Sequence, residues 1–202
     1  MTTFYIIRHA EKEKGDFYNP RLRHQDQPIS QKGCLDAEKL YSYFSNKAIS
    51  AIYVSGYQRT GQTIAFAARQ LHIEPTVDER LNEFDIGCIE GMADQEIQEK
   101  YPDVLKAYLE RTSDFRFPGG ETGEEAARRI TAYLEEIRRL HAGESIILVS
   151  HDGLIRVLAC TILGLPVYHR WKFRVDLCGI MEIAAQADGD KWKLIRFNQS
   201  CL

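Results

Sequence analysis

The sequence contains no run of apolar residues that approaches the roughly 20 needed for a membrane-spanning helix. It also has no low-complexity tract, no internal repeat, and no basic region with a cleavage signal ahead of the first apolar segment. We therefore expect a cytoplasmic protein without a membrane partner. The 202 residues, of which 44% are hydrophobic and 27% charged, suffice for one substantial core. We expect a single domain over residues 1–202.

The cysteines follow no recognisable pattern. The chain has five cysteines, an odd number, and no CxxC arrangement. They are Cys34, Cys88, Cys160, Cys178 and Cys201. Such wide spacing favours reduced thiols over a disulfide framework or a zinc cluster.

The chain also lacks a strong excess of charge of either sign. Its 26 lysine and arginine residues nearly balance 29 aspartate and glutamate residues, which gives a net charge of −3. This balance argues against an extended nucleic-acid surface, because such surfaces are strongly basic. A local basic pocket in a weakly acidic chain suits a small anionic substrate. A homo-oligomer is left open.

Short apolar runs alternate along the chain with segments of helical spacing. Strands are predicted at 4–7, 51–54, 75–77, 146–149, 177–184 and 191–197. Helices are predicted from Ser30 to Phe44, from Thr60 to Leu71, from Thr122 to Leu140 and from Leu154 to Leu163. This order predicts a three-layer α/β fold, with a mainly parallel sheet and helices on both of its faces.

Residues that can take part in catalysis follow the predicted strands. Arg8 and His9 end the first strand, His151 ends the fourth, and Glu83 follows the short third strand. Arg59 falls near a helix N-terminus, where unpaired N–H groups and the helix dipole favour an anion. The carboxyl ends of strands in such sheets face the ligand crevice. We therefore expect these five side chains to form one site.

This combination of side chains suits phosphoryl transfer. A histidine with an ordinary pKa of about 6.5 offers a neutral ring nitrogen that can attack phosphorus. Arg8, Arg59 and a protonated His151 would stabilise the phosphoryl oxygens, and Glu83 would protonate the leaving oxygen and then deprotonate a water. These cations balance the negative charge of the phosphoryl group, and the site has only one carboxylate to bind a metal. We therefore expect neither a metal nor another cofactor.

Five segments occur in an order that resembles a known family. They are RHAE at 8–11, SGYQRTGQT at 55–63, LNEFDIGCIEG at 81–91, FPGGET at 117–122 and SHDG at 150–153. Together they resemble branch 1 of the histidine phosphatase superfamily, with its phosphoglycerate mutase-like fold, over nearly the whole chain. The resemblance implies that His9 is the phosphorylated nucleophile, that Arg8, Arg59 and His151 hold the phosphoryl oxygens, and that Glu83 donates the proton. It also implies a small, mostly helical excursion over the site, which we assign to residues 84–121.

The chain departs from the usual family pattern shortly after the RHAE motif. Many members have an asparagine seven residues after the arginine, but this chain has Gly15 there. Asn19, Arg21 and Arg23 are candidates to replace the contact, and Arg116 is a further candidate for substrate binding within the excursion.

Hydrolysis of a small phosphorylated metabolite is the favoured activity. A phosphoglycerate mutase-type transferase would need further fixed cations for a bisphosphate and a more closed lid. The excursion offers Lys100, Lys106, Arg111 and Arg116 but no paired arginines. A non-catalytic phosphate-binding module is the other alternative, although binding alone requires neither a nucleophile nor a proton donor.

Overall fold

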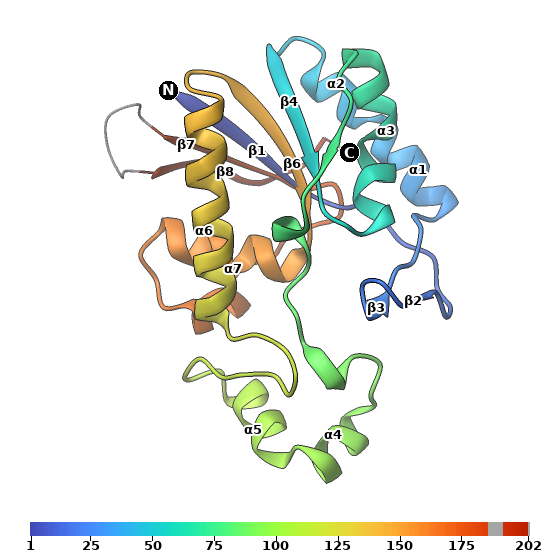
Figure 1. The fold of residues 1–202 in the computed structure, drawn as a ribbon, viewed down its shortest axis with the longest axis vertical. Helices are drawn as coiled ribbons and strands as arrows, with labels where there is room; N and C mark the ends of the chain where they lie inside the picture. The colour runs from blue at the N-terminus through green and yellow to red at the C-terminus, as the bar shows by residue number, and fades with distance from the viewer. Residues whose placement is uncertain (186–191, 202) are drawn as a thin grey trace.

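The computed structural model describes residues 1–185 and 192–201, and within them a six-stranded sheet forms the centre of the fold (Figure 1). Its strands are β1 (Thr2–Arg8), β4 (Ile49–Val54), β5 (Thr76–Val77), β6 (Ser145–Ser150), β7 (Ile180–Ala185) and β8 (Trp192–Gln199). The strand order is β5-β4-β6-β1-β7-β8. Strands β5, β4, β6 and β1 run parallel to one another, β7 runs antiparallel to β1, and β8 runs antiparallel to β7. The predicted mainly parallel sheet is confirmed.

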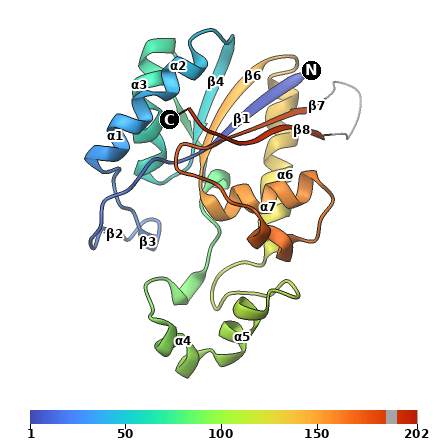
Figure 2. The ribbon, with the colours of Figure 1, turned by 180° about the vertical axis from the view of Figure 1, so that it is seen from behind.

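Helices cover both faces of this sheet because alternate strand residues point to opposite sides. Phe4 and Ile6 of β1 join one core with α6 (Gly123–Leu140) and α7 (Asp152–Ile162). Tyr5 and Ile7 join a second core with α1 (Gln31–Glu38), α2 (Leu40–Phe44) and α3 (Gln58–Leu71). Figures 1 and 2 show the two helical layers on opposite sides of the strands. The three-layer α/β class is therefore confirmed.

The helix starts follow the predicted caps. The Ser30 hydroxyl accepts a hydrogen bond from the Gly33 N–H at 3.0 Å. Thr122 and Glu125 form a reciprocal capping box, in which each side chain accepts the other residue's backbone N–H. The predicted single helix from Ser30 to Phe44 is wrong, however. A tight turn separates α1 from α2, because the Lys39 N–H bonds to the carbonyl only three residues earlier.

The late strands also differ from the prediction. Strand β7 begins at Ile180 and not at 177, because the residues before it form a turn. In that turn the Gly179 N–H donates to the Asp176 carbonyl at 2.9 Å, and Cys178 has a φ of 55°. Strand β8 is described from Trp192, so Lys191, the predicted first residue, lies outside the described residues.

The remaining elements lie at the carboxyl end of the sheet. They are β2 (Tyr18–Asn19), β3 (His24–Gln25), η1 (Glu79–Leu81), η2 (Gly87–Ile89), α4 (Asp94–Lys100), α5 (Pro102–Glu110) and η3 (Val167–Lys172). Helices α4 and α5 belong to the predicted excursion and project beyond the sheet layers (Figures 1 and 2). All five cysteines are free. No helix in the two described ranges is long and apolar enough to cross a membrane.

The excursion leaves and rejoins the core through a neck, formed by residues 85–88 and 118–121. The Cys88 N–H donates to the Pro118 carbonyl at 2.7 Å, and the Glu121 N–H donates to the Asp85 carbonyl at 3.0 Å. Gly87 lies between these two segments and has a φ of 59°. A Cβ there would lie 2.1 Å from the Pro118 carbonyl oxygen. The close approach therefore requires glycine at this position.

We predict that Gly87→Ala lowers the free energy of unfolding by at least about 2 kcal/mol, because it adds backbone strain and a steric overlap. In Gly61→Ala, the control within α3, the added Cβ meets no atom within 4 Å. This control should be neutral or more stable by about 0.5–1 kcal/mol. Thermal unfolding of both variants would measure the difference, and equal melting temperatures would contradict the account of the neck.

Candidate active site

The five predicted site residues come together at the carboxyl end of the parallel strands. Strands β1 and β6 are neighbours in register, with Arg8 opposite Ser150, so the next residues, His9 and His151, adjoin. Their ring centroids are 5.2 Å apart. Arg59 from the first turn of α3 contacts His151, while Glu83 reaches the first turn of α7.

His9 is held as a neutral imidazole with one ring nitrogen free of a proton. Its side chain is buried, and Nδ1 lies 2.8 Å from the Ala10 carbonyl oxygen. A carbonyl can only accept, so Nδ1 carries the hydrogen and Nε2 keeps its lone pair. Burial, followed by the charge of Arg59, lowers the pKa of His9 to about 3. The ring is therefore in the state that a nucleophilic histidine requires.

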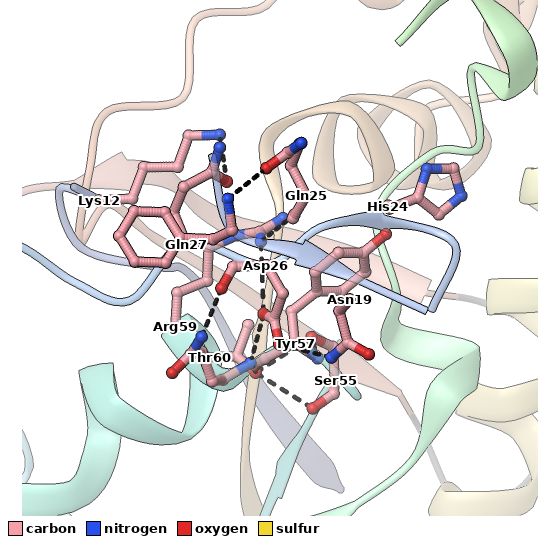
Figure 3. Close-up of polar contacts among 12 residues, drawn as sticks. Lys12, Asn19, His24, Gln25, Asp26, Gln27, Ser55, Tyr57, Arg59 and Thr60 are labelled. Carbon is pink, nitrogen blue, oxygen red and sulfur yellow. Dashed lines mark hydrogen bonds and ion pairs between the residues drawn. The ribbon is translucent and has the colours of Figure 1, made fainter. Parts of the chain in front are cut away.

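Arg59 is buried and fixed by groups from separate segments. Its guanidinium stacks on the Tyr57 ring at 4.2 Å and has Nη1 4.0 Å from the Asp26 carboxylate. Nη2 donates to Nδ1 of His151 at 3.2 Å. Figure 3 shows Arg59 among Tyr57, Asp26 and Gln25, the last two from the segment around β3. Burial lowers the pKa of Arg59 from its usual value, but an arginine stays charged in proteins.

The contacts of His151 favour a neutral ring, and the protonated ring expected during phosphoryl transfer stays a prediction. Its side chain is fully buried, and because Nδ1 accepts from Arg59, the ring hydrogen lies on Nε2. Nε2 is 2.8 Å from the Ser55 hydroxyl oxygen and donates to it. Burial is the largest cause that holds the pKa of His151 well below its ordinary value, followed by the charge of Arg59.

Arg8 lies at the edge of the site with part of its guanidinium already bound. Nη1 donates to the Val175 carbonyl at 2.5 Å and lies 3.9 Å from the Asp152 carboxylate. Its Nε is buried and has no hydrogen-bond partner in the described part of the chain. Arg8 can therefore supply charge next to His9 without being neutralised by a close ion pair.

Glu83 is held by backbone N–H groups at the start of α7. One carboxyl oxygen accepts from Phe84 at 2.8 Å and Leu154 at 3.1 Å, and the other accepts from Gly153 at 3.3 Å. Burial nevertheless raises the pKa of Glu83, which favours the protonated form that a general acid needs. A Cβ at Gly153 would lie 2.8 Å from Oε1, so glycine at this position admits the carboxyl group.

A cavity of about 430 Å³ extends from Arg59 and Glu83 beneath the excursion. His24 also lines it, and its Nδ1 lies 2.7 Å from the Glu90 carboxylate. This contact joins the β2–β3 hairpin to the excursion. The cavity is therefore placed to receive the part of a substrate that extends beyond the group held by the arginines.

The structure does not bring the four weaker candidates into this cavity. Arg21 pairs with Glu79 at 2.7 Å, and Arg23 is exposed. Arg116 pairs with Glu125 and donates to the Gly120 carbonyl at 2.9 Å. The Asn19 side chain donates to Asp26 at 3.0 Å. None of these four lines the cavity. Their substrate-binding roles stay predictions, and these contacts do not support them.

Sequence reasoning missed Lys12, Ser55, Asp26 and Gly153. Lys12 lies three residues after His9, and its Nζ donates to Gln27 at 3.2 Å (Figure 3). Its charge contributes to the low pKa values of both site histidines. A lysine directly after the RHAE motif was the available signal for this residue. Asp26 carried no comparable signal, because its contact with Arg59 depends on how the 12–29 segment folds back.

The chain belongs to branch 1 of the histidine phosphatase superfamily, whose family model matches residues 4–200. Phosphoserine phosphatase 1 of Hydrogenobacter thermophilus is 31% identical over 179 residues, which cover 87% of this chain and 83% of that protein. A probable phosphoglycerate mutase of Salmonella choleraesuis is also 31% identical, over 92% of this chain and 86% of its own.

Solved structures show the same fold. A mycobacterial glucosyl-3-phosphoglycerate phosphatase superimposes with a TM-score of 0.82 at 20% identity, over 98% of this chain and 99% of the other. Bacillus stearothermophilus YhfR gives a TM-score of 0.81 at 24% identity, over 96% of both chains. At these identities the structural likeness concerns the fold.

We predict that the free energy of unfolding falls as the pH is lowered from about 6.5 toward 3. In this window the unfolded chain protonates His9 at an ordinary pKa of about 6.5, while the folded protein resists protonation until about 3. His9→Gln should therefore reduce the slope by up to ~1.4 kcal/mol per pH unit. Urea unfolding at several pH values measures this, with His169→Gln as the control outside the site. An unchanged slope in His9→Gln would contradict the burial of a neutral ring.

Proposed function

We propose that this protein hydrolyses phosphate monoesters in two steps through a phosphohistidine at His9. The observation that carries the proposal is the hydrogen bond from Nδ1–H of His9 to the Ala10 carbonyl. This bond leaves Nε2 unprotonated beside two arginines. Nε2 attacks phosphorus, the bond between phosphorus and the ester oxygen breaks, and Glu83 transfers its proton to the leaving oxygen. The alcohol then departs through the cavity.

The second step returns the enzyme to its starting state. The Glu83 carboxylate takes a proton from a water, whose oxygen attacks phosphorus as the bond to Nε2 breaks. His9 is again neutral, and inorganic phosphate is released. The backbone N–H groups that hold Glu83 keep its carboxyl in one place for both proton transfers.

Arg8 and Arg59 provide the fixed positive charge for the phosphoryl oxygens. His151 contributes in two ways. Its neutral ring orients Arg59 through Nδ1, and a phosphoryl dianion beside it would raise the pKa of His151 again. Substrate binding can therefore bring a proton to His151 that the site does not hold beforehand.

Hydrolysis is favoured over mutase-type transfer because the cations of the excursion already have contacts. These contacts are Lys100 with Glu96, Lys106 with Glu110, Arg111 with the Tyr108 and Trp171 rings, and Arg116 with Glu125. A mutase must bind a second phosphate while the first is on histidine, which calls for cations that face the site. The alternative predicts phosphate exchange between two positions of a bisphosphate in place of phosphate release.

The substrate class within this proposal is a small phosphorylated metabolite, in line with the names of the phosphatase relatives. A cytoplasmic location and the absence of a nucleic-acid partner are predictions from composition and charge. A homo-oligomer remains open.

Glu83→Gln tests the proposed proton transfer. It should lower kcat for alkyl phosphates by about 10²–10⁴-fold, because the leaving alkoxide then lacks a proton donor. The loss should be much smaller for p-nitrophenyl phosphate, whose leaving group departs without protonation. Glu90→Gln, which changes another carboxyl group in the cavity, serves as the matched control and should not distinguish the two leaving groups. Equal losses in Glu83→Gln for both esters would remove Glu83 from the acid role.

Chelation tests whether the fixed cations suffice. Activity should survive exhaustive treatment with EDTA, because Arg8, Arg59 and His151 meet the charge of the phosphoryl group. Initial rates before and after dialysis against the chelator are the measurement. A large loss that stoichiometric magnesium or zinc restores would show that a metal takes part.

A further inference from the structure

The walls of the cavity beyond Glu83 are mostly apolar. Ile86 and Ile89 come from the start of the excursion, Ile97 from α4, Leu105 and Tyr108 from α5, and Trp171 from η3. These side chains come from four separate parts of the fold and line the same cavity. Apolar walls of this extent select ligands through the surface that the ligand removes from water.

The basic side chains that line the cavity have carboxylates close to them. Arg156 pairs with Asp152 at 2.8 Å, and His24 with Glu90 at 2.7 Å. Arg170 is 2% exposed and pairs with Asp114 at 3.5 Å. Each basic side chain of the wall other than Arg59, which serves the phosphoryl group, therefore has a carboxylate partner.

Two buried donors in the wall do not alter this balance. Arg170 Nη2 and Trp171 Nε1 have no hydrogen-bond partner in the described ranges, but both atoms are themselves covered. Neither atom is exposed to solvent. Among the carboxylates that line the cavity, Asp94 is exposed and begins α4.

The cavity is also large for a small alcohol. Its volume is about 430 Å³. At about 30 Å³ per water molecule, this corresponds to roughly 14 waters, more than a serine leaving group would fill. It falls within the range of about 300–1,000 Å³ that is usual for pockets that enclose larger organic ligands.

We propose that the alcohol released by this enzyme is bulky, uncharged and largely apolar, with an aryl or extended alkyl body that fills this cavity. The inference rests on the hydrolase function proposed above. A leaving group with its own carboxylate would place that charge among apolar side chains and already paired cations, which is unfavourable. A hydrocarbon body would instead gain from burial along the whole wall.

A series of primary alkyl phosphates tests this inference, because their alcohols have similar intrinsic reactivity. The series is ethyl, butyl and 3-phenylpropyl phosphate, compared with O-phosphoserine, 3-phosphoglycerate and phosphoethanolamine as charged substrates. The value of kcat/KM for 3-phenylpropyl phosphate should exceed that for ethyl phosphate by on the order of 100-fold. All three charged substrates should fall below butyl phosphate.

A charge placed in the wall should reverse this preference. Leu105→Lys should lower kcat/KM for 3-phenylpropyl phosphate by at least about 10-fold and raise it for 3-phosphoglycerate. Leu109→Lys is the matched control on α5, because Leu109 is 65% exposed and does not line the cavity. The substrate series on the unmodified protein stands independently if Leu105→Lys fails to fold.

The possible outcomes separate the inference from the function on which it rests. Rapid hydrolysis of phosphoserine, 3-phosphoglycerate or phosphoethanolamine, with slow turnover of the phenylpropyl ester, would overturn the apolar leaving group and leave the hydrolase intact. A flat size series would do the same. Failure to release phosphate from any of these esters would overturn the hydrolase function itself.

Discussion

Arg59 carries a buried positive charge whose neighbours come from three separate parts of the chain. Asp26 comes from the segment around β3. Tyr57, the N-cap residue of α3, stacks on the guanidinium, and His151 follows β6. The same charge helps to hold both site histidines neutral, since it lowers the pKa of His9 and of His151. One guanidinium thus provides positive charge for an anion while it favours the unprotonated state of the neighbouring His9.

The position of Glu83 depends on a second constraint, which is the backbone at the start of α7. Two N–H groups of this turn, from Gly153 and Leu154, hold the carboxyl together with the N–H of Phe84, and Gly153 leaves the space that it occupies. Such donors stabilise the ionised form, but burial raises the pKa of Glu83 despite them. The balance suits a group that must give up a proton in one step and regain it in the next. Burial therefore lowers the pKa of His9 and raises the pKa of Glu83.

The positions of the catalytic candidates could be predicted from sequence because they depend on local patterns. Arg8, His9 and His151 end apolar strands, and parallel strands must meet at one edge. The protonation state that its contacts favour at His151 could not be predicted in this way. It depends on hydrogen bonds to Arg59 and Ser55, which are distant in sequence and meet only in the folded protein.

The same limit applies to the outer parts of the site. Arg21 and Arg116 are basic and near the motifs, but each faces a carboxylate whose position no periodicity reveals. The break between α1 and α2 escaped prediction because the apolar spacing continues across Lys39. The excursion could be assigned from the family resemblance, whereas the apolar walls of the cavity emerge only when α4, α5 and η3 are placed together.

The central claim is that His9 becomes covalently phosphorylated during turnover. Rapid quenching without acid, using a substrate labelled in its phosphoryl group, tests this claim most directly when it is followed by peptide mapping. We expect the label on His9 in a linkage that is stable to base and labile to acid. We also expect neither label nor turnover in His9→Ala. Label on a serine or cysteine, or near-normal turnover by His9→Ala, would contradict the mechanism.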